Sequence, residues 1–311
     1  MSLPAILLTD SSEKAVKALE GQAECLNWEQ AEARAEEIVG MLIYGHPTID
    51  GPVMDRFPNL KVISNCGVGV DHINVADAKA RGLLVGNTPG VLSEATADMA
   101  FTLLLAAGRR LVEGDHYARS PAFVHFDSNF MLGTEISGTT LGIIGMGRIG
   151  QEVARRGLGF NMKVLYHNRK PKQIDDPAIQ ATYVSKEELL RNSDYVVIVV
   201  PLNDETRDLI TFEDFEMMKS TAVLVNIARG GVVNTDAITK ALQTNQIYAA
   251  GLDVTEPEPL PRDHPLLLQK NLTIAPHLGS ATVQTRQKMA DLSVANLLNG
   301  IADKDIVSSV M

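Results

Sequence analysis

Short apolar runs alternate with helical patterns along almost the whole chain. Up to residue 90, amphipathic stretches such as 31–38 and 74–82 separate runs typical of buried strands: 5–9, 40–45, 60–65 and 83–88. This alternation is typical of βαβ units, which build a parallel sheet. We therefore expect a small α/β domain that ends near Pro89 and Gly90.

A second series of strands follows a long helical pattern. Residues 92–111, rich in Ala and Leu, predict one helix with Ser93 as a candidate N-cap. The Val, Ile and Leu content of the next runs favours strands covered on both faces. These runs are 140–145, 163–167, 194–200, 222–228, 248–254 and 271–276. Six such strands predict a complete dinucleotide-binding domain.

The last helical pattern, 285–301, is too short to fold alone, and its simplest placement is back on the first domain. We therefore predict an α/β fold of two Rossmann-like, doubly wound parallel-sheet domains with an active-site cleft between them. Residues 1–90 with 283–311 would form a discontinuous, flavodoxin-like substrate-binding domain. Residues 91–282 would form the dinucleotide-binding domain.

Composition narrows the class of partner. The formal net charge of −10 over 311 residues disfavours nucleic acid and anionic membranes. No apolar segment is long enough to predict a membrane span, and the first residues show no basic leader. Cys25 and Cys66 lack the spacing of a disulfide framework or a metal site. We expect a cytoplasmic protein without a metal that acts on small polar metabolites.

A glycine-rich turn indicates the cofactor. Gly145, Gly147 and Gly150 stand in GxGxxG register between an apolar run and a helical pattern. The first glycine permits a tight turn, the second lets the backbone approach a pyrophosphate, and the third allows the helix to pack closely. The helix N-terminus would add amide donors. The same predicted cofactor-binding loop contains Met146, Arg148 and Ile149.

The next strand ends without the acid expected for NAD. Asn168 lies about 20 residues beyond the loop, where a carboxylate would bind the ribose 2′-hydroxyl and repel a 2′-phosphate. Asn168 removes that repulsion, and Arg169 can bind phosphate oxygens. The position predicts a preference for NADP(H), with NAD(H) possible. The alternative is that Asn168 and Arg169 belong to an ordinary surface cluster. Arg148, in the glycine-rich loop, is equally compatible with a phosphate contact and with a solvated helix start.

Three late strand ends carry polar residues that a core does not require. Arg229 precedes two glycines, Asp253 precedes a proline-rich loop that contains Glu256 and Glu258, and His277 precedes another glycine. Taken singly, an arginine before two glycines is more commonly a helix-start or surface residue, a glutamate between prolines is usually solvated, and a lone histidine is seldom catalytic. The carboxyl ends of strands in an open α/β sheet bind its ligands, so their joint placement favours a site.

Several stretches together carry a family resemblance: NCGVGVDHI, NTPGVLSEATADMAFTLLLAAGRR, LGIIGMGRIG, VNIARGGVVN, AGLDVTEPEPLP and APHLGSAT. In this order they resemble the D-isomer-specific 2-hydroxyacid dehydrogenases along essentially the whole chain. Through GLDVTEPEPLPRDHPLL and LYHNR, the chain is most similar to the glyoxylate/hydroxypyruvate reductase group, which includes relatives labelled 2-ketogluconate reductases.

The resemblance implies roles for individual residues. It places the family's catalytic arginine, glutamate and histidine on Arg229, Glu258 and His277, and Glu256 is not the matching acid. The nicotinamide-contacting aspartate falls on Asp253. The loop that binds the substrate carboxylate by its backbone N–H groups falls on Val68 and Gly69. Further cofactor-lining positions are Thr96, Pro201, Thr206, Ile227 and Gly279.

The implied reaction is reduction of a small 2-oxo acid, such as glyoxylate or hydroxypyruvate, to the D-2-hydroxy acid. A nicotinamide supplies the hydride, and His277 would act as the general acid. Glu258 would orient the imidazole, and Arg229 would grip the carboxylate and carbonyl oxygens. The alternatives are an NAD-linked enzyme of the D-lactate or phosphoglycerate type and, less favoured, a nucleotide-sensing corepressor-like binding protein.

The resemblance also implies a homodimer. Family members usually pair through the cofactor domain, and residues 114–134 would form the arm. In some relatives a tryptophan from the neighbouring subunit enters the active site from this segment. Trp28 is the only tryptophan in the chain, so Phe126 or Phe130 would have to take that place.

Overall fold

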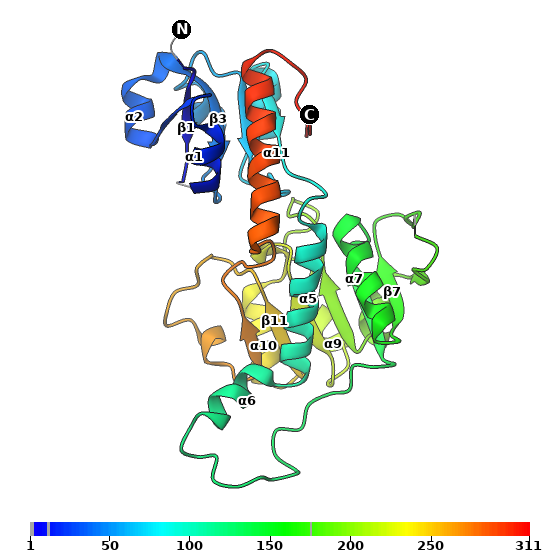
Figure 1. Ribbon diagram of the computed structural model, residues 1–311. Coiled ribbons are helices and arrows are strands. Elements are labelled where there is room, and N and C mark those ends of the chain that lie inside the picture. The colour runs from blue at the N-terminus through cyan, green and yellow to red at the C-terminus, as the bar shows by residue number, and fades with distance from the viewer. Residues whose placement is uncertain (1–2, 11–12, 175) are drawn as a thin grey trace. The chain divides into compact units, whose positions relative to one another are not determined.

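The computed structural model describes residues 3–10, 13–174 and 176–311 and divides the chain into two compact units (Figure 1). One unit runs up to Leu92 and includes Thr282–Met311, and the other is Ser93–Ala281. Each unit holds one parallel sheet with helices packed on it. The predicted fold class, two parallel-sheet α/β domains, is confirmed. The roles predicted for the two domains stay predictions at this point.

In the described part of the first unit, the sheet has five parallel strands in the order β2-β1-β3-β4-β5, which is the flavodoxin order. The strands are β1 (Ala5–Leu8), β2 (Glu24–Leu26), β3 (Ile38–Ile43), β4 (Val62–Asn65) and β5 (Leu84–Gly86). The helices that connect them are α1 (Glu13–Leu19), α2 (Trp28–Ala33), α3 (Gly51–Met54) and α4 (Val75–Ala80), with the 3-10 turn η1 (Ala35–Glu37).

Two departures from the sequence pattern occur near the start of this unit. Strand β2 was not expected, because its three residues grade from exposed to buried and form no apolar run. The predicted helix over 31–38 is divided between α2 and η1, and Ile38 already belongs to β3. Ile38 is fully buried, so sheet burial rather than the helical pattern decides its structure.

Helix α11 (Val283–Ile301) packs on the first unit's sheet, against β3, β4 and β5. The sheet carries glycine where the helix comes closest: a Cβ at Gly40 would lie 2.7 Å from a Leu297 methyl, and one at Gly86 would lie 2.9 Å from the Asn296 amide nitrogen. Beyond α11 the chain returns to the sheet edge, where Ser309 forms an antiparallel bridge with Gly86.

In the described part of the second unit, the sheet has seven parallel strands in the order β12-β11-β10-β9-β6-β7-β8. They are β6 (Thr140–Ile144), β7 (Lys163–His167), β8 (Ala181–Tyr183), β9 (Tyr195–Ile198), β10 (Val223–Asn226), β11 (Ala249–Leu252) and β12 (Leu272–Ile274). The expected count of six was wrong, because the partly exposed edge strand β8 carries no apolar run.

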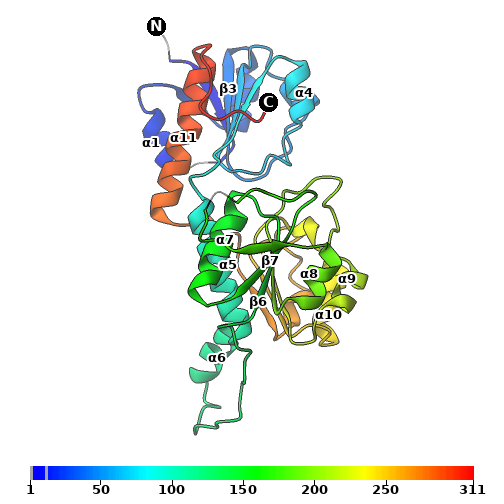
Figure 2. The ribbon, with the colours of Figure 1, turned by 90° about the vertical axis from the view of Figure 1, so that its right-hand side faces the viewer.

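Both faces of this sheet are buried, as the continuous apolar runs indicate. In β10, Leu224 belongs to one core while Val223 and Val225 belong to the other. Helices α5 (Ser93–Gly108) and α7 (Arg148–Gly159) cover one face (Figure 2). The other face packs on α8 (Lys186–Asn192), α9 (Phe212–Met217) and α10 (Thr235–Gln243). The 3-10 turns are η2 (Gly230–Val232) and η3 (Pro265–Leu268).

The helix observed as α5 is shorter than the helix predicted over 92–111. Ser93 is the first residue of α5 rather than the residue before it, and α5 ends at Gly108. Arg110 then adopts a left-handed conformation with φ of 53°, which ends the helix before α6 (Leu111–Ala118) begins. The described part of the chain contains no helix long and apolar enough to cross a membrane.

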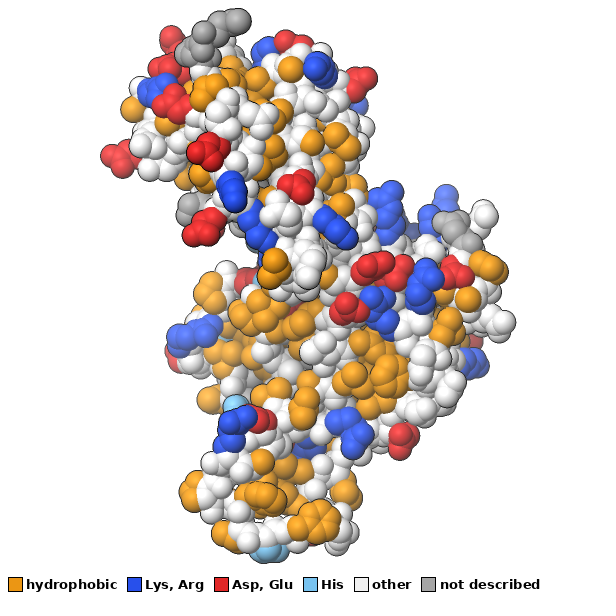
Figure 3. Space-filling model, viewed as in Figure 1, with side chains coloured by type: hydrophobic (Ala, Val, Ile, Leu, Met, Phe, Trp, Pro, Cys, Tyr) orange, Lys and Arg blue, Asp and Glu red, His pale blue; other side chains and the backbone are white. Residues whose placement is uncertain are grey.

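Residues 119–139 leave α6 as a long loop that extends from the rest of its unit (Figure 1). Apolar side chains gather on this segment (Figure 3). Val124 and Phe126 are 77% and 83% exposed, and Phe130 is 48% exposed. Scattered exposed apolar residues are ordinary, but a concentration on one projecting segment indicates an interaction surface.

Candidate active site

The three glycines of the GxGxxG turn have separate structural reasons. Gly145 has φ of 108°, and a Cβ there would lie 2.5 Å from the Val199 carbonyl oxygen. A Cβ at Gly150 would lie 2.1 Å from the Gly145 carbonyl oxygen, so this glycine lets α7 start directly against the turn. A Cβ at Gly147 would meet nothing within 4 Å, which leaves open space beside the helix start.

The start of α7 suits an anion. Gly147 is the N-cap residue, and no side chain caps the first turn. Its amide donors and helix dipole therefore face the open space beside Gly147, where a pyrophosphate fits. Arg148 is exposed on this turn, whereas Ile149 is half-buried. The Met146 side chain is fully buried in the core, so its predicted contact with a cofactor would have to come from its backbone.

Asn168 and Arg169 follow β7 and have different partners. The Asn168 side-chain oxygen accepts a hydrogen bond of 2.7 Å from the Met146 N–H, so Asn168 holds the glycine turn. The Arg169 guanidinium forms an ion pair with Glu205, and both side chains are largely exposed. A phosphate that binds Arg169 must therefore compete with a carboxylate.

The loop after β9 is closed by Thr206. Its hydroxyl donates to the Pro201 carbonyl oxygen at 2.6 Å and accepts from the Asn203 N–H at 2.9 Å. The Asn203 side chain accepts from the N–H groups of Glu205 and Thr206 at 3.0 and 3.1 Å. The polar groups of Thr206 therefore shape the loop that carries Glu205.

Arg229 follows β10 in a turn held by Asn226. The buried Asn226 side chain accepts from the Ala228 N–H at 3.0 Å and donates to the Arg229 carbonyl oxygen at 2.8 Å. Gly230 lets the next loop approach, because a Cβ there would lie 2.0 Å from the Thr255 carbonyl carbon. Ile227, one of the predicted cofactor-lining residues, is 7% exposed and packs in the core. These contacts fix the backbone from which the Arg229 side chain extends.

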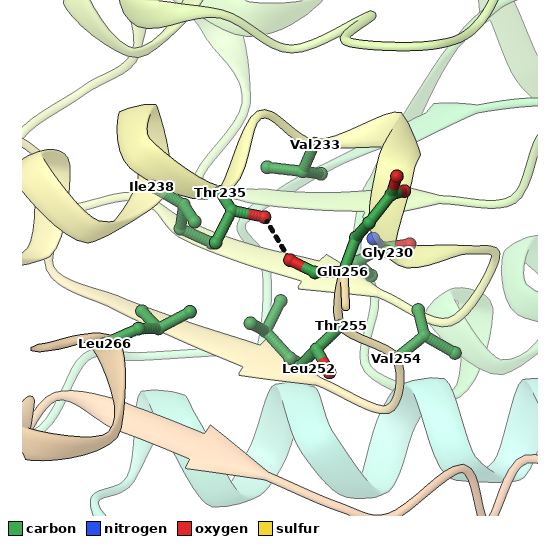
Figure 4. Close-up of a pocket in the computed structure, with 10 residues that line it drawn as sticks. Gly230, Val233, Thr235, Ile238, Leu252, Val254, Thr255, Glu256 and Leu266 are labelled. Carbon is green, nitrogen blue, oxygen red and sulfur yellow. Dashed lines mark hydrogen bonds between the residues drawn. The ribbon is translucent and has the colours of Figure 1, made fainter. Parts of the chain in front are cut away.

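A small pocket is lined by Gly230 and by apolar side chains of β11 and α10, among them Ile238 and Leu252 (Figure 4). The Thr235 hydroxyl donates to the Glu256 carbonyl oxygen at 3.0 Å across one side of it. Of the residues that line the pocket, Glu256 alone is charged, and its negative charge would repel a substrate carboxylate. None of the lining residues is positively charged, so the pocket is poorly suited to bind a substrate carboxylate.

Asp253 anchors the turn that presents His277. Asp253 is 1% exposed, and its carboxylate accepts from the N–H groups of Leu278 and Gly279 at 2.6 and 2.7 Å. Burial raises the pKa of Asp253, while these two amide donors act to lower it. The Asp253 carbonyl oxygen also accepts from the His277 N–H at 2.8 Å. A Cβ at Gly279 would lie 3.0 Å from the Asp253 carboxylate and 3.4 Å from the Thr96 methyl, so Thr96 lies beside this turn.

His277 itself has a left-handed backbone, with φ of 57°. Such a conformation costs a residue other than glycine about 1–2 kcal/mol. The hydrogen bonds to Asp253 from His277 and the two residues after it offset this cost.

Glu258 is the acid that contacts the histidine. His277 Nδ1 lies 2.9 Å from Glu258 Oε1, and the two side chains are 30% and 36% exposed. Glu256 instead pairs with Arg207 at 2.7 Å. Arg229, Glu258 and His277 follow β10, β11 and β12, which are consecutive neighbours in the sheet. The Glu258 carboxylate thus orients the His277 imidazole. The Arg229 guanidinium comes from the loop after β10, two strands away from β12 in the sheet.

Val68 and Gly69 lie in the first unit, in the loop after β4. Both are half-buried. Their carbonyl oxygens accept hydrogen bonds from Asn87 and Asn65, each at 2.9 Å. The loop is therefore fixed by asparagine side chains at strand ends.

Comparison with known proteins identifies the family. Residues 101–279 match the model of the D-isomer specific 2-hydroxyacid dehydrogenase NAD-binding domain. The chain belongs to the D-isomer-specific 2-hydroxyacid dehydrogenase family. It is therefore an oxidoreductase of a family that uses NAD(P), which confirms the resemblance seen in the sequence motifs.

Two curated relatives of this dehydrogenase are named glyoxylate reductases. The one from Thermococcus kodakarensis is 48% identical over 254 residues, which cover 80% of this chain and 76% of the relative. The one from Pyrococcus horikoshii is 40% identical over 308 residues, covering 95% and 92% of the two chains.

A solved structure is also similar to this dehydrogenase: the NADPH-dependent glyoxylate/hydroxypyruvate reductase of Sinorhizobium meliloti, in complex with NADP and malonate. It is 32% identical, has a TM-score of 0.90, and the match covers 99% of this chain and 97% of that chain. The likeness extends over both parallel sheets.

Sequence patterns missed two features of this dehydrogenase. The Arg169–Glu205 pair joins loops that follow β7 and β9, strands that are brought together only because both border β6. The structural asparagines Asn226 and Asn87 lie at strand ends, which is the signal that could have identified them. An amide there can both donate to and accept from the backbone of the following loop.

The Asp253 anchor predicts a loss of stability on removal of its charge. In Asp253→Asn, one of the two N–H groups would face an NH₂ group instead of an oxygen. We expect the free energy of unfolding, measured in urea, to fall by about 1–3 kcal/mol. Asp263→Asn, at an exposed position of the same unit, should change it by less than about 0.5 kcal/mol. Equal stability of the two variants would contradict the anchoring role.

Proposed function

We propose that the protein is an NADPH-preferring reductase that converts glyoxylate, hydroxypyruvate or a similar small 2-oxo acid to the D-2-hydroxy acid. The observation that carries this proposal is the 2.9 Å contact between His277 Nδ1 and Glu258 Oε1. Arg229 follows β10 in the same sheet, two strands from the strand that precedes His277. The family membership supports the reaction type. The names of the relatives support the substrate class.

His277 is the proposed general acid. A nicotinamide, when bound, supplies the hydride, and the carbonyl oxygen then needs a proton. Since Glu258 engages Nδ1, the proton is delivered from the other ring nitrogen, Nε2. Glu258 keeps the ring in this orientation and stabilises the protonated imidazole.

Arg229 and the loop at Val68 and Gly69 are the proposed groups that bind the substrate carboxylate. A guanidinium can offer two parallel N–H donors to a carboxylate, a task for which an ammonium group is poorly shaped. The backbone N–H groups of Val68 and Gly69 would add further donors. The turn that Asn226 holds keeps the Arg229 backbone in place during turnover.

The glycine turn fits a dinucleotide. The open space at Gly147 and the uncapped start of α7 suit a pyrophosphate, and Asn168 presents no negative charge to a 2′-phosphate. Asp253, Thr96 and Gly279 lie together and form the proposed nicotinamide side. Arg148, Pro201 and Thr206 remain proposed cofactor-lining residues.

The ion pair between Arg169 and Glu205 favours the second candidate, an NADH-linked enzyme of the same family. Glu205 would repel a 2′-phosphate and occupy the cation that should bind it. NADPH preference therefore requires that the phosphate displace Glu205.

The homodimer and the cytoplasmic location stay predictions. The exposed apolar side chains within the predicted arm, residues 114–134, support pairing through it, and Phe126 and Phe130 are among them. The mass of the protein in solution measures the oligomeric state directly.

Enzyme kinetics test the proposed chemistry. With NADPH and a panel of 2-oxo acids, we expect the wild type to reduce glyoxylate or hydroxypyruvate best. His277→Ala and Arg229→Ala should each lower kcat/KM by at least about a hundredfold, the usual effect of losing a general acid or a key electrostatic contact.

Glu256 and Glu258 lie in one loop, and Glu256 provides the control for Glu258. Glu258→Gln should lower kcat, whereas Glu256→Gln, which alters the partner of Arg207, should leave it within about twofold. Near-normal turnover by His277→Ala, or equal effects of the two glutamine variants, would refute the assignment.

The proposed choice of cofactor is tested at Arg169 and Glu205. Arg169→Ala should raise the KM for NADPH about tenfold or more and leave that for NADH nearly unchanged, because only NADPH carries the 2′-phosphate. Glu205→Gln should lower the KM for NADPH, because Arg169 loses its competing carboxylate. Asp204→Asn removes a charge one residue away and should have the smaller effect. An equal response of both cofactors to Arg169→Ala would favour the NADH-linked candidate.

A further inference from the structure

The loop over residues 66–70 is held through its carbonyl oxygens. The Gly67 oxygen accepts from the Asn65 side chain at 3.1 Å and from the Thr88 N–H at 3.0 Å. The Gly69 oxygen accepts from the same Asn65 side chain at 2.9 Å. Asn65 is 2% exposed at the end of β4, so its amide is a fixed anchor.

The Val68 carbonyl is held by a separate residue, Asn87, whose side-chain nitrogen donates at 2.9 Å. In a planar trans peptide, the carbonyl of one residue and the N–H of the next point in opposite directions. The bond from Asn87 to Val68 therefore aims the N–H of Gly69, and the bonds to Gly67 likewise aim the N–H of Val68. Within the described residues, neither N–H donates to a protein acceptor.

Asn87 is in turn held by a distant part of the chain. Its side-chain oxygen accepts from the Ser308 hydroxyl at 3.0 Å, and its N–H donates to the Ser308 carbonyl oxygen at 3.3 Å. Its carbonyl oxygen accepts from the Asn296 side chain at 3.0 Å, and the Asn296 side-chain oxygen accepts from the Ser308 N–H at 2.9 Å. Every polar group of Asn87 is thus engaged, and Asn296 and Ser308 provide all its partners except Val68.

The two asparagines of this arrangement are buried, and Ser308 is half-buried. Asn87 is 8% exposed and Asn296 is fully buried, and the missing side chain at Gly86 leaves room for the Asn296 amide. A buried polar group that loses its partner bears the full cost of desolvation, so the network is stable only as a whole.

We propose that Asn87, Asn296 and Ser308 are positioning residues that aim the N–H groups of the substrate-binding loop and thereby set the affinity for the 2-oxo acid. This rests on the proposed function, in which Val68 and Gly69 bind the substrate carboxylate. Asn87 is the link that touches the loop. Asn296, from α11, and Ser308 fix its orientation.

Ser308→Ala tests the proposal with the smallest change. It removes one hydroxyl and leaves the side-chain oxygen of Asn87 buried without that donor, while the backbone bonds of residue 308 can persist. We expect the KM for glyoxylate to rise about threefold to thirtyfold, the range that follows from leaving the buried Asn87 oxygen without its hydrogen-bond donor. The KM for NADPH should stay within about twofold, because the proposed cofactor residues lie in the other unit.

Two neighbouring variants act as controls. Ser309→Ala alters the adjacent hydroxyl, which accepts only from the Met311 N–H among the described contacts, and should leave both KM values unchanged. Ser308→Thr keeps a hydroxyl and should restore much of the wild-type KM for glyoxylate. Asn87→Ala should have a larger effect than Ser308→Ala, with thermal unfolding used to confirm that each variant is folded.

The outcomes separate the two proposals. A folded Ser308→Ala variant with wild-type KM for glyoxylate would overturn the positioning role while the wild type remains an active reductase. Parallel rises in the KM for glyoxylate and for NADPH would also overturn it, because they indicate a general loss of structure. A wild type that reduces no 2-oxo acid with either cofactor would overturn both proposals.

Discussion

The two hydrogen bonds accepted by the buried carboxylate of Asp253 hold the turn on which the candidate chemistry depends. They tie Leu278 and Gly279 to the end of β11 and keep His277 in a left-handed backbone conformation that it would not adopt alone. Glu258 then meets the imidazole from the loop that follows the same strand. Removing the charge of Asp253 would therefore disturb the turn that carries His277, the proposed proton donor, without altering His277 itself.

In both units, asparagines at strand ends hydrogen-bond to loop backbone groups that have no partner in a strand. Asn65 and Asn226 end their strands, and Asn87 and Asn168 follow directly after theirs. Each hydrogen-bonds to the backbone of a loop that a parallel sheet presents at its carboxyl edge. An amide can donate and accept at once, so it can satisfy loop groups that have no strand partner. Hydrogen bonds from these asparagine side chains therefore fix the backbone of the loops that carry the proposed binding groups.

The fold was largely predictable because parallel strands buried on both faces leave continuous apolar runs, as in β9 and β10. The edge strands β2 and β8 were not predicted, because half-exposed strands lack a continuous apolar run. The contact of His277 with Glu258 followed from the motifs, and the structure shows it directly. The pairing of Arg169 with Glu205 depends on the strand order of the second sheet, which local patterns do not reveal. The link from Ser308 through Asn87 to Val68 depends on the return of the chain to the first sheet after α11, which local patterns also do not reveal.

The proposed function requires that hydride pass from a nicotinamide to C2 of a small 2-oxo acid beside His277. This transfer is measured by following the label from NADPH deuterated at C4, in each of its two stereoisomers, during reduction of hydroxypyruvate. We expect that one isomer transfers its deuterium and that the product is D-glycerate labelled at C2. Formation of L-glycerate, or of glycerate without deuterium from both isomers, would contradict it.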